Sequence, residues 1–277
     1  MKFTTGVQQY MFRDYFKSEA QAVETMKRIK ETGYDAIELC GFLMEPTELT
    51  KGTPLEVTAR FDYPALVKEA GIGVCSLHEV LEMMIADPDG YIGKAQKFRT
   101  TSMVSAATVA TDFADIKSVR KLTKDLNALG EIFKKAGINL VYHNHNMEFA
   151  HVHGTSLTGM DFILSETDPE YVKAELDAFW TTNSGANPVT WVQKFSGRMT
   201  HLHLNDCGVP DDAPGVSIRA AVGRELGAGN MELEKIIQGA KQSACQTIVL
   251  ETHDNWINND PFESCAISYR YLTTHLD

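Results

Sequence analysis

Short apolar runs alternate with longer amphipathic stretches along the whole chain. Strands are predicted where β-branched and other apolar residues form short runs, over 3–10, 35–40, 72–78, 102–108, 138–145, 172–177, 199–206 and 247–252. Helices are predicted in the stretches that follow them, over 19–33, 63–71, 94–100, 119–137, 156–165, 188–196, 231–241 and about 260–275. Gly33, Gly71 and Gly137 each close one of these helices, as glycine often does just after a helix C-terminus.

These eight successive strand–helix units predict a parallel sheet, because a helix between two strands returns the chain to the end of the sheet where the first strand began. Eight units in 277 residues match the size of a (β/α)8 TIM barrel. A doubly wound open sheet is the alternative, but no G-x-G-x-x-G motif follows the first strand. No linker or low-complexity tract divides the chain, so we expect one domain over residues 1–277.

Composition narrows the function classes. The formal net charge of −11 argues against binding to a nucleic-acid backbone, which needs clustered Lys and Arg. No apolar stretch is long enough for a membrane span or a signal peptide. The five cysteines are dispersed and form no C-x-x-C pair, which favours a reducing compartment. We therefore expect a cytoplasmic protein that contacts neither nucleic acid nor membrane.

Candidate ligands and bases gather at the predicted strand ends, where TIM barrels carry their active sites. Strand five runs into "YHNHNMEF" (142–149), strand six ends at Asp177, strand seven carries His201 and His203, and strand eight ends in Glu251. One imidazole with two or three carboxylates suits Mn²⁺, Mg²⁺, Co²⁺ or catalytic Zn²⁺. His201 and His203 point the same way, and His203 lies nearer the strand end, so it is the better placed ligand.

Five segments together resemble the xylose isomerase-like TIM barrel superfamily, the sugar phosphate isomerase/epimerase group: "YHNHNMEF", "ELDAFW" (175–180), "HLHLND" (201–206), "GAGNMEL" (227–233) and "LETHD" (250–254). The resemblance implies one divalent metal, commonly Mn²⁺, held by residues from strands five to eight. Carried over to this sequence, the ligands are Asp177, His203 and Glu251. For strand five, Glu148 is the preferred ligand and His143 is the alternative.

Three positions depart from the pattern of the family. Asn205 stands where many relatives have a lysine, and Trp180 stands where ketose epimerases carry a substrate-binding histidine. Glu232 replaces an aspartate of the family before the last-but-one helix. The first two changes weigh against a ketose-3-epimerase and against phosphosugar binding.

The resemblance implies an enzyme that removes a proton next to a carbonyl of a sugar or keto-sugar. We expect His145 and Glu148 on one face of the substrate and Glu251 on the other as catalytic groups, since an unperturbed histidine titrates near neutral pH. Arg13, His78 and His253 are expected to orient the substrate, and Trp180 to offer a flat apolar face.

A sugar isomerase or epimerase is the first hypothesis. The alternative is a lyase on the same metal, either an inosose dehydratase-like enzyme or one that eliminates the β-substituent of a 3-keto-glycoside. The net charge disfavours an endonuclease of the same superfamily, and the intact ligand set disfavours a non-catalytic sugar-binding subunit. Relatives form homodimers, and some that process keto-glycosides pair with a different subunit.

Overall fold

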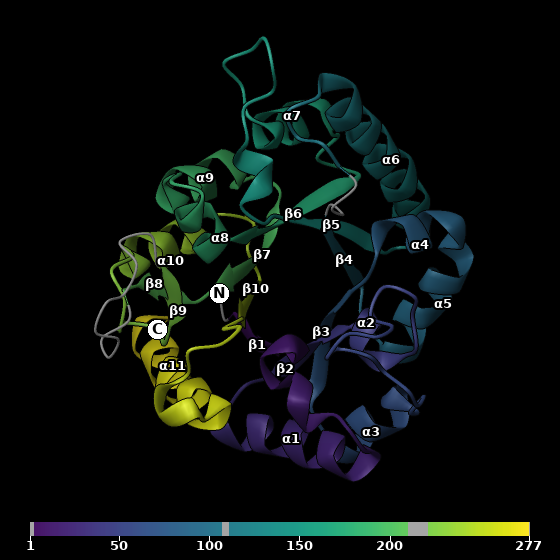
Figure 1. Cartoon of the computed structure of the whole chain (residues 1–277), viewed down its shortest axis with the longest axis vertical. Coiled ribbons are helices and arrows are strands. Elements are labelled where there is room, and N and C mark those ends of the chain that lie inside the picture. The colour runs from purple at the N-terminus through teal and green to yellow at the C-terminus, as the bar shows by residue number, and fades with distance from the viewer. Residues whose placement is uncertain (1–2, 107–110, 210–220, 277) are drawn as a thin grey trace.

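The computed structural model describes residues 3–106, 111–209 and 221–276. Eight parallel strands close into a barrel in the order β1-β10-β7-β6-β5-β4-β3-β2 (Figure 1). They are β1 (Thr4–Gln8), β2 (Ala36–Cys40), β3 (Gly73–His78), β4 (Ser102–Ala106), β5 (Asn139–His143), β6 (Val172–Asp177), β7 (Met199–Leu204) and β10 (Thr247–Leu250). The predicted TIM barrel is confirmed, and the open sheet is excluded because β1 pairs with both β10 and β2.

Helices surround the barrel (Figure 1). The outer ring consists of α1 (Glu19–Thr32), α3 (Tyr63–Ala70), α5 (Pro88–Phe98), α6 (Ile116–Lys135), α7 (Gly159–Glu166), α9 (Pro188–Phe195), α10 (Leu233–Lys241) and α11 (Pro261–Leu276). Shorter helices follow strand ends: α2 (Gly41–Met44), α4 (Leu81–Ala86), α8 (Ala178–Asn183) and the 3₁₀ turns η1 (Gln9–Tyr15), η2 (Met147–Phe149) and η3 (Ile257–Asn259). These shorter helices shape the C-terminal mouth of the barrel, where sites form in this architecture.

Helix α6 illustrates how the local sequence determines the bounds and the buried face of a helix in the outer ring. The Asp115 carboxylate accepts hydrogen bonds from the backbone N–H groups of Lys117 and Ser118, which closes the helix N-terminus. Lys134 and Lys135 lie in the last turn, where positive charge favours the helix dipole. Buried residues recur every three or four positions along the helix and form one face: Val119, Leu122, Thr123, Leu126, Leu129, Gly130 and Phe133. Periodicity and capping therefore mark the position of this helix in the sequence itself.

The structure shortens or divides some predicted elements. The first strand ends at Gln8, and the residues predicted to extend it to position 10 begin η1. The seventh strand ends at Leu204, and Asp206 begins the hairpin β8 (Asp206–Gly208) and β9 (Val222–Arg224). Helices α2, α4 and α8 were not predicted. The sequence also predicts a loop with Pro210 and Pro214 after the seventh strand, and this loop lies outside the described residues.

Asp206 explains why the chain leaves the barrel after β7. Its carboxylate accepts hydrogen bonds from four backbone N–H groups, those of Cys207, Gly227, Gly229 and Met231. Four such donors satisfy a buried carboxylate and fasten the segment before α10 to the end of β7. The expected acidic residue Glu232 lies at the start of α10 and pairs with Lys235.

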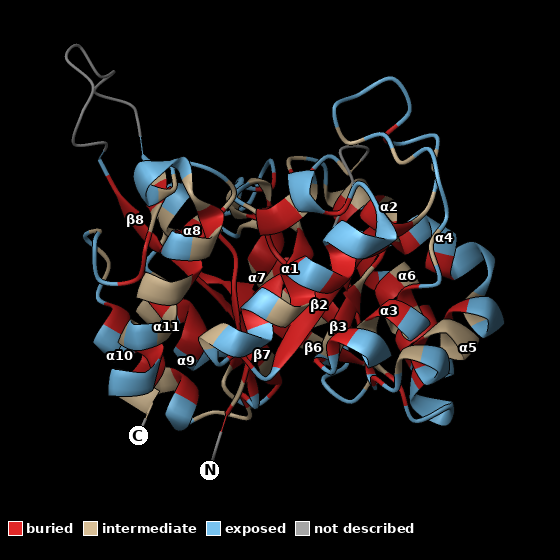
Figure 2. Cartoon of the chain, turned by 90° about the horizontal axis from the view of Figure 1, so that it is seen from below, coloured by how far each residue is buried: buried red, intermediate tan, exposed pale blue. Residues whose placement is uncertain are grey.

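The interior of the barrel is apolar except near the C-terminal ends of the strands. Strands and the inward faces of the helices are buried, and the outward helix faces are exposed (Figure 2). Several buried ionisable residues break the apolar core, among them Glu38, Glu175, Asp177, His203 and Glu251. Charges are rarely buried unless they are paired or hold a metal, so this group marks a functional site. Within the described residues, no helix is both long and apolar enough to cross a membrane.

Candidate active site

Four ligand-type side chains converge at the C-terminal mouth of the barrel. His143 ends β5, Asp177 ends β6, His203 lies on β7 and Glu251 directly follows β10. One ligand atom from each lies within 4.8 Å of those of the other three, and all four side chains are buried. The four strands are consecutive in the barrel, which explains why residues more than a hundred positions apart share one site. We call these four residues the ligand cluster.

Glu175 holds both histidines of the ligand cluster from below. Its Oε2 atom lies 3.1 Å from His143 Nδ1 and 3.2 Å from His203 Nε2. Glu175 is fully buried and lies two residues before Asp177 on β6, so both carboxylates point into the barrel. One carboxylate therefore orients two imidazoles that come from different strands.

Glu38 on β2 forms the other side of this lower layer. Its Oε1 atom lies 3.1 Å from His203 Nε2 and 3.3 Å from His78 Nδ1. Ser76 Oγ donates a hydrogen bond of 2.5 Å to Oε2, and Gln8 Nε2 donates one of 3.1 Å to Oε1. Glu38 is thus satisfied by four neighbours from three other strands.

Burial and mutual charge perturb the acidic groups of the site. Burial, with the adjacent carboxylate of Glu251, raises the pKa of Asp177 to about 7. Burial alone would also raise the pKa of Glu251, but His253 and His203 hold it well below its usual range. Burial and the charge of Glu38 raise the pKa of Glu175. Such opposed shifts among close groups are typical of functional sites.

The donor set fits a divalent cation. Two imidazoles and two carboxylates match the mixed N/O ligands of such ions. Among the described residues, no cysteine belongs to the ligand cluster. Both histidines also have one ring nitrogen against a carboxylate of the lower layer. A metal-ligating histidine usually has such a partner, which fixes its tautomer and its orientation. The ligand cluster can therefore hold a metal ion.

A cavity of about 450 Å³ opens beside the ligand cluster. We call it the catalytic pocket. Its lining includes His143 and Glu251 of the ligand cluster, together with Gln8, Tyr10, Phe42, His78, Glu79, His145, Trp180 and His253. This size and this mixture of aromatic and polar groups are usual for small-molecule sites.

Three buried polar atoms of the catalytic pocket have no hydrogen-bond partner in the described part of the chain. They are Gln8 Oε1, His145 Nδ1 and Trp180 Nε1. An unsatisfied buried polar atom costs about 1–3 kcal/mol, so natural structures rarely leave three together. The amide oxygen accepts and the indole N–H donates, so a ligand that carries hydroxyl groups satisfies both, and a carbonyl group satisfies the indole N–H.

The two candidates for the strand-five metal ligand, His143 and Glu148, lie in different surroundings in the structure. His143 joins the ligand cluster, whereas Glu148 lies in the turn η2 and accepts hydrogen bonds from Tyr142 Oη (2.9 Å) and from the backbone N–H of His145 (3.0 Å). Glu148 neither joins the described metal-ligand groups nor lines the catalytic pocket. Its carboxylate supports the chain segment that carries His145.

The protonation of His145 differs from the expectation. Its ring lines the catalytic pocket, 5.0 Å from His143 between ring centroids. Burial, with the adjacent His143, lowers the pKa of His145 to about 3. The imidazole is therefore neutral at physiological pH, and it is a weaker base than an unperturbed histidine.

Three of the four expected substrate-binding residues line the catalytic pocket. They are His78, Trp180 and His253. The Trp180 ring lies between two histidines, 5.7 Å from the centroid of His145 and 5.4 Å from that of His253. His253 Nε2 lies 2.8 Å from Glu251 Oε1, which ties it to the ligand cluster.

Arg13 lies outside the catalytic pocket. Its guanidinium donates to the carbonyl oxygens of Tyr10 (3.1 Å) and His253 (2.7 Å), and it lies over the Tyr10 ring. Arg13 therefore braces η1 against the loop that follows β10. It positions two pocket residues and is not part of the lining of the catalytic pocket.

Sequence reasoning missed several residues of the site. Glu175 was not proposed, although its place two residues before Asp177 puts both on one face of β6. Gln8 and Glu38 lie on the predicted strands 3–10 and 35–40 and were not expected among the site residues. Phe42 and Tyr10 carried no signal, because a single aromatic residue in a sequence is more often part of the core.

The comparison with protein-family models matches residues 26–266 to the xylose isomerase-like TIM barrel family. The chain belongs to this family. The matched stretch includes the whole ligand cluster and the lower layer beneath it, so the xylose isomerase-like barrel and its candidate site are covered together.

Among curated proteins, the chain resembles an inosose dehydratase of Mesomycoplasma hyopneumoniae (strain 7448), with 32% identity over 124 residues. The match covers 44% of this chain and 34% of that protein. An inosose dehydratase of Clostridium tetani is 31% identical over 90 residues, which are 31% of this chain and 28% of that protein. The chain therefore spans about a third of the length of these curated relatives.

Solved structures share the fold over nearly the whole chain. A sugar phosphate isomerase/epimerase from Parabacteroides distasonis superposes with a TM-score of 0.74 at 23% identity, covering 98% of this chain and 94% of that one. A xylose isomerase-like TIM barrel protein from Mycobacterium smegmatis in complex with magnesium gives 0.70 at 15% identity, covering 99% and 96%. The proteins that this chain is similar to thus include a sugar phosphate isomerase/epimerase and inosose dehydratases.

Proposed function

We propose that this protein is a divalent-metal-dependent sugar isomerase or epimerase that removes a proton next to a carbonyl of a sugar or keto-sugar. One observation carries the proposal. Gln8 Oε1, His145 Nδ1 and Trp180 Nε1 are buried without partners in the same cavity that reaches the ligand cluster. A polyhydroxylated ligand with a carbonyl group would satisfy them beside the metal-binding groups.

The proposed metal ligands are His143, Asp177, His203 and Glu251. His143 takes the strand-five position because Glu148 is engaged with Tyr142 and with the backbone of His145. When bound, a divalent cation polarises a carbonyl oxygen and stabilises the negative charge that builds up on it. We favour Mn²⁺ on the family resemblance, and the magnesium complex of the Mycobacterium smegmatis relative supports a divalent ion.

Glu251 and His253 would accept the proton that is removed from one side of the substrate. Glu251 Oε1 takes the proton, and His253 Nε2, 2.8 Å away, shares it. His145, neutral and open to the pocket, faces the substrate as a hydrogen-bond partner and as the second base of an epimerase. Glu148 supports the His145 segment and does not touch the substrate.

A lyase on the same ligand cluster is the second candidate. The identity to inosose dehydratases over 90 to 124 residues favours it. Elimination needs a base for the proton and an acid for the leaving hydroxyl or alcohol, and the Glu251–His253 pair with His145 supplies groups for both tasks. Both candidates begin with the same proton removal.

Proton exchange separates these candidates. The metal-loaded protein is incubated in D₂O with ketoses, inososes and 3-keto-glucosides, and the products are followed by NMR and ultraviolet absorbance. An isomerase or epimerase incorporates deuterium at one carbon and yields a new stereoisomer or aldose. A lyase instead releases water or an alcohol and forms a conjugated enone.

Glu251→Gln is expected to lose this activity by at least about a hundredfold, in line with the loss of a positioned base. Glu234→Gln, on the exposed face of α10, is the matched control. Absence of exchange on every substrate by a protein that holds its metal would overturn the proposal. A sugar or keto-sugar substrate, a cytoplasmic location and assembly as a homodimer or hetero-oligomer stay predictions.

A further inference from the structure

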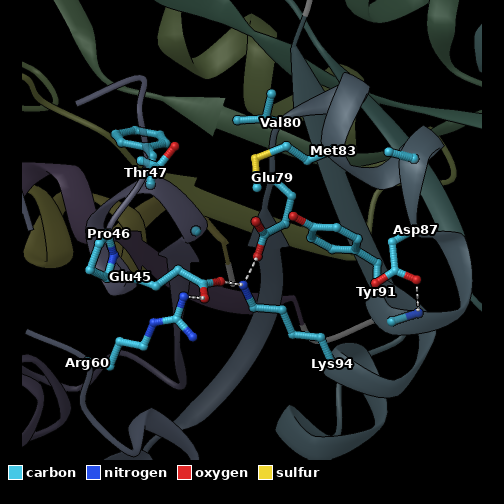
Figure 3. Close-up of a pocket in the computed structure, with 14 residues that line it drawn as sticks. Glu45, Pro46, Thr47, Arg60, Glu79, Val80, Met83, Asp87, Tyr91 and Lys94 are labelled. Atoms are coloured by element: carbon cyan, nitrogen blue, oxygen red, sulfur yellow. Dashed lines mark hydrogen bonds and ion pairs between the residues drawn. The ribbon is translucent and has the colours of Figure 1, made fainter. Parts of the chain in front are cut away.

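A second cavity of about 450 Å³ lies beside the catalytic pocket. We call it the side cavity; α2, α4 and α5 contribute to its lining (Figure 3). It shares Phe42, Glu79 and Val80 with the lining of the catalytic pocket. These three residues border both cavities, so the two cavities adjoin.

The charges of the side cavity do not suit an anion. Lys94 Nζ lies 2.8 Å from Glu45 Oε1 and 2.8 Å from Glu79 Oε1, and Arg60 also faces Glu45 at 4.0 Å (Figure 3). Both cations of the lining are therefore paired with carboxylates. Asp87 adds a third carboxylate, which caps α5 through the N–H of Gly90. A phosphate group here would face more negative than positive charge.

The position of Glu79 depends on a glycine. A Cβ atom on Gly41 would lie 1.8 Å from Glu79 Oε2, so any other residue at position 41 would displace this carboxylate. Glu79 is 5% exposed, and its ion pair with Lys94 compensates its burial. The Glu79–Lys94–Glu45 arrangement therefore lies where the two cavities adjoin.

The rest of the lining suits a neutral ring that carries hydroxyl groups. Phe42, Val80, Met83 and Tyr91 supply apolar and aromatic surface for the flat face of a ring. Carboxylates at the edge accept hydrogen bonds from hydroxyl groups, and a paired lysine still donates one. Sugar rings combine an apolar face with hydroxyl groups around the rim, so they match both features.

We propose that the side cavity binds a neutral hydroxylated ring joined to the sugar that reacts in the catalytic pocket. The substrates are then two-ring glycosides and not phosphorylated monosaccharides. This inference rests on the proposed function for the identity of the catalytic pocket. The bond between the two rings then lies beside Phe42, Glu79 and Val80, which border both cavities.

Filling the side cavity tests the inference. Ala86 lines the side cavity but not the catalytic pocket, so Ala86→Trp occupies space there and removes no existing contact. Ile85 lies next to it on α4, is 40% exposed and lines neither cavity, so Ile85→Trp is the matched control. Binding of glucose, cellobiose and glucose 6-phosphate to the metal-loaded proteins is measured by ligand-observed NMR titration.

We expect wild type and Ile85→Trp to bind cellobiose at least about tenfold more tightly than glucose, which corresponds to about 1.4 kcal/mol. Ala86→Trp should abolish this preference and leave glucose binding unchanged. Glucose 6-phosphate should bind no more tightly than glucose.

Three results would overturn the inference: no cellobiose preference in wild type, a preference that survives Ala86→Trp, or tighter binding of glucose 6-phosphate that Ala86→Trp removes. The binding assay needs no turnover, so the two proposals can fail separately. If the proposed function fails, no substrate exchanges a proton although the cellobiose preference is present. If only the side cavity is misassigned, proton exchange occurs without that preference.

Discussion

Glu175 Oε2 lies 3.1 Å from His143 Nδ1, and the two side chains come from adjacent strands of the barrel. The same oxygen lies 3.2 Å from Nε2 of His203 on the opposite neighbouring strand. A single buried carboxylate thus orients both imidazoles of the ligand cluster. The orientation of the ligand cluster therefore depends on a residue outside the cluster.

Glu175→Gln is expected to weaken metal binding by roughly 10- to 100-fold, because the amide cannot hold both imidazoles by charge. Competition between the protein and a chelator for Mn²⁺ or Zn²⁺ measures the change. Glu225→Gln is the control, since Glu225 is also buried but binds the backbone N–H of Ile257 away from the ligand cluster. Equal metal affinity in all three proteins would show that Glu175 has no such role.

The strand-five ligand is expected to be His143 and not Glu148. His143→Ala should lower the metal content of the purified protein from about one ion per chain to well below half, because it removes one of four ligands. Glu148→Gln should keep its metal, and His151→Ala, at an exposed position, serves as the histidine control. Plasma mass spectrometry gives the metal content, and loss of metal in Glu148→Gln alone would restore Glu148 as the ligand.

Glu148 also predicts a pH dependence of stability. Burial raises its pKa from an ordinary 4.5 to about 7, so the folded protein keeps a proton that the unfolded chain has lost between these values. The stabilising contribution is therefore complete below about pH 4.5 and is lost as the pH rises through about 7. Replacing the carboxyl by a neutral amide removes this term, which is worth up to roughly 3 kcal/mol.

The free energy of unfolding of wild type and Glu148→Gln, measured by urea denaturation with a chelator present, checks this prediction between pH 5 and pH 8. The wild type should lose more stability over this range than the variant. Parallel curves would show that Glu148 is ionised in the folded protein throughout this range.

Trp180→Phe keeps an aromatic ring in the catalytic pocket and removes the unpartnered indole N–H. We expect KM to rise about three- to tenfold with little change in kcat, the effect of one hydrogen bond made equally in ground and transition states. Trp191→Phe is the matched control, because Trp191 is buried in α9 and lines neither cavity. An unchanged KM in Trp180→Phe would remove Trp180 from the substrate contacts.

Local patterns in the sequence were sufficient to predict the barrel. The alternation of short apolar runs with amphipathic stretches reappears as eight strands and their helices, and β6 over Val172–Asp177 has the predicted bounds. The polar residues at the predicted strand ends also indicated where the site lies, because parallel strands bring their carboxyl ends together. Asp177, His203 and Glu251 were expected there, and the structure brings them together.

Short segments after the strands could not be predicted in the same way. Helices α2, α4 and α8 have only four to six residues, too few for a periodic pattern to emerge. Gln8, Phe42 and Tyr10 line the catalytic pocket because the chain turns directly after β1 and β2. Such turns depend on tertiary contacts, including the brace that Arg13 makes to the carbonyl oxygen of His253.

The sequence by itself determined the order of the elements, the barrel and the strands that carry the chemistry, because these follow from local periodicity and from the direction of parallel strands. Only the tertiary structure separates His143, which joins the ligand cluster, from Glu148, which lies five residues further along the same segment. The turn η2 directs Glu148 toward Tyr142, whereas His143 points into the barrel above Glu175. Which donors meet depends on side-chain direction and on partners from distant strands, and no local pattern encodes either.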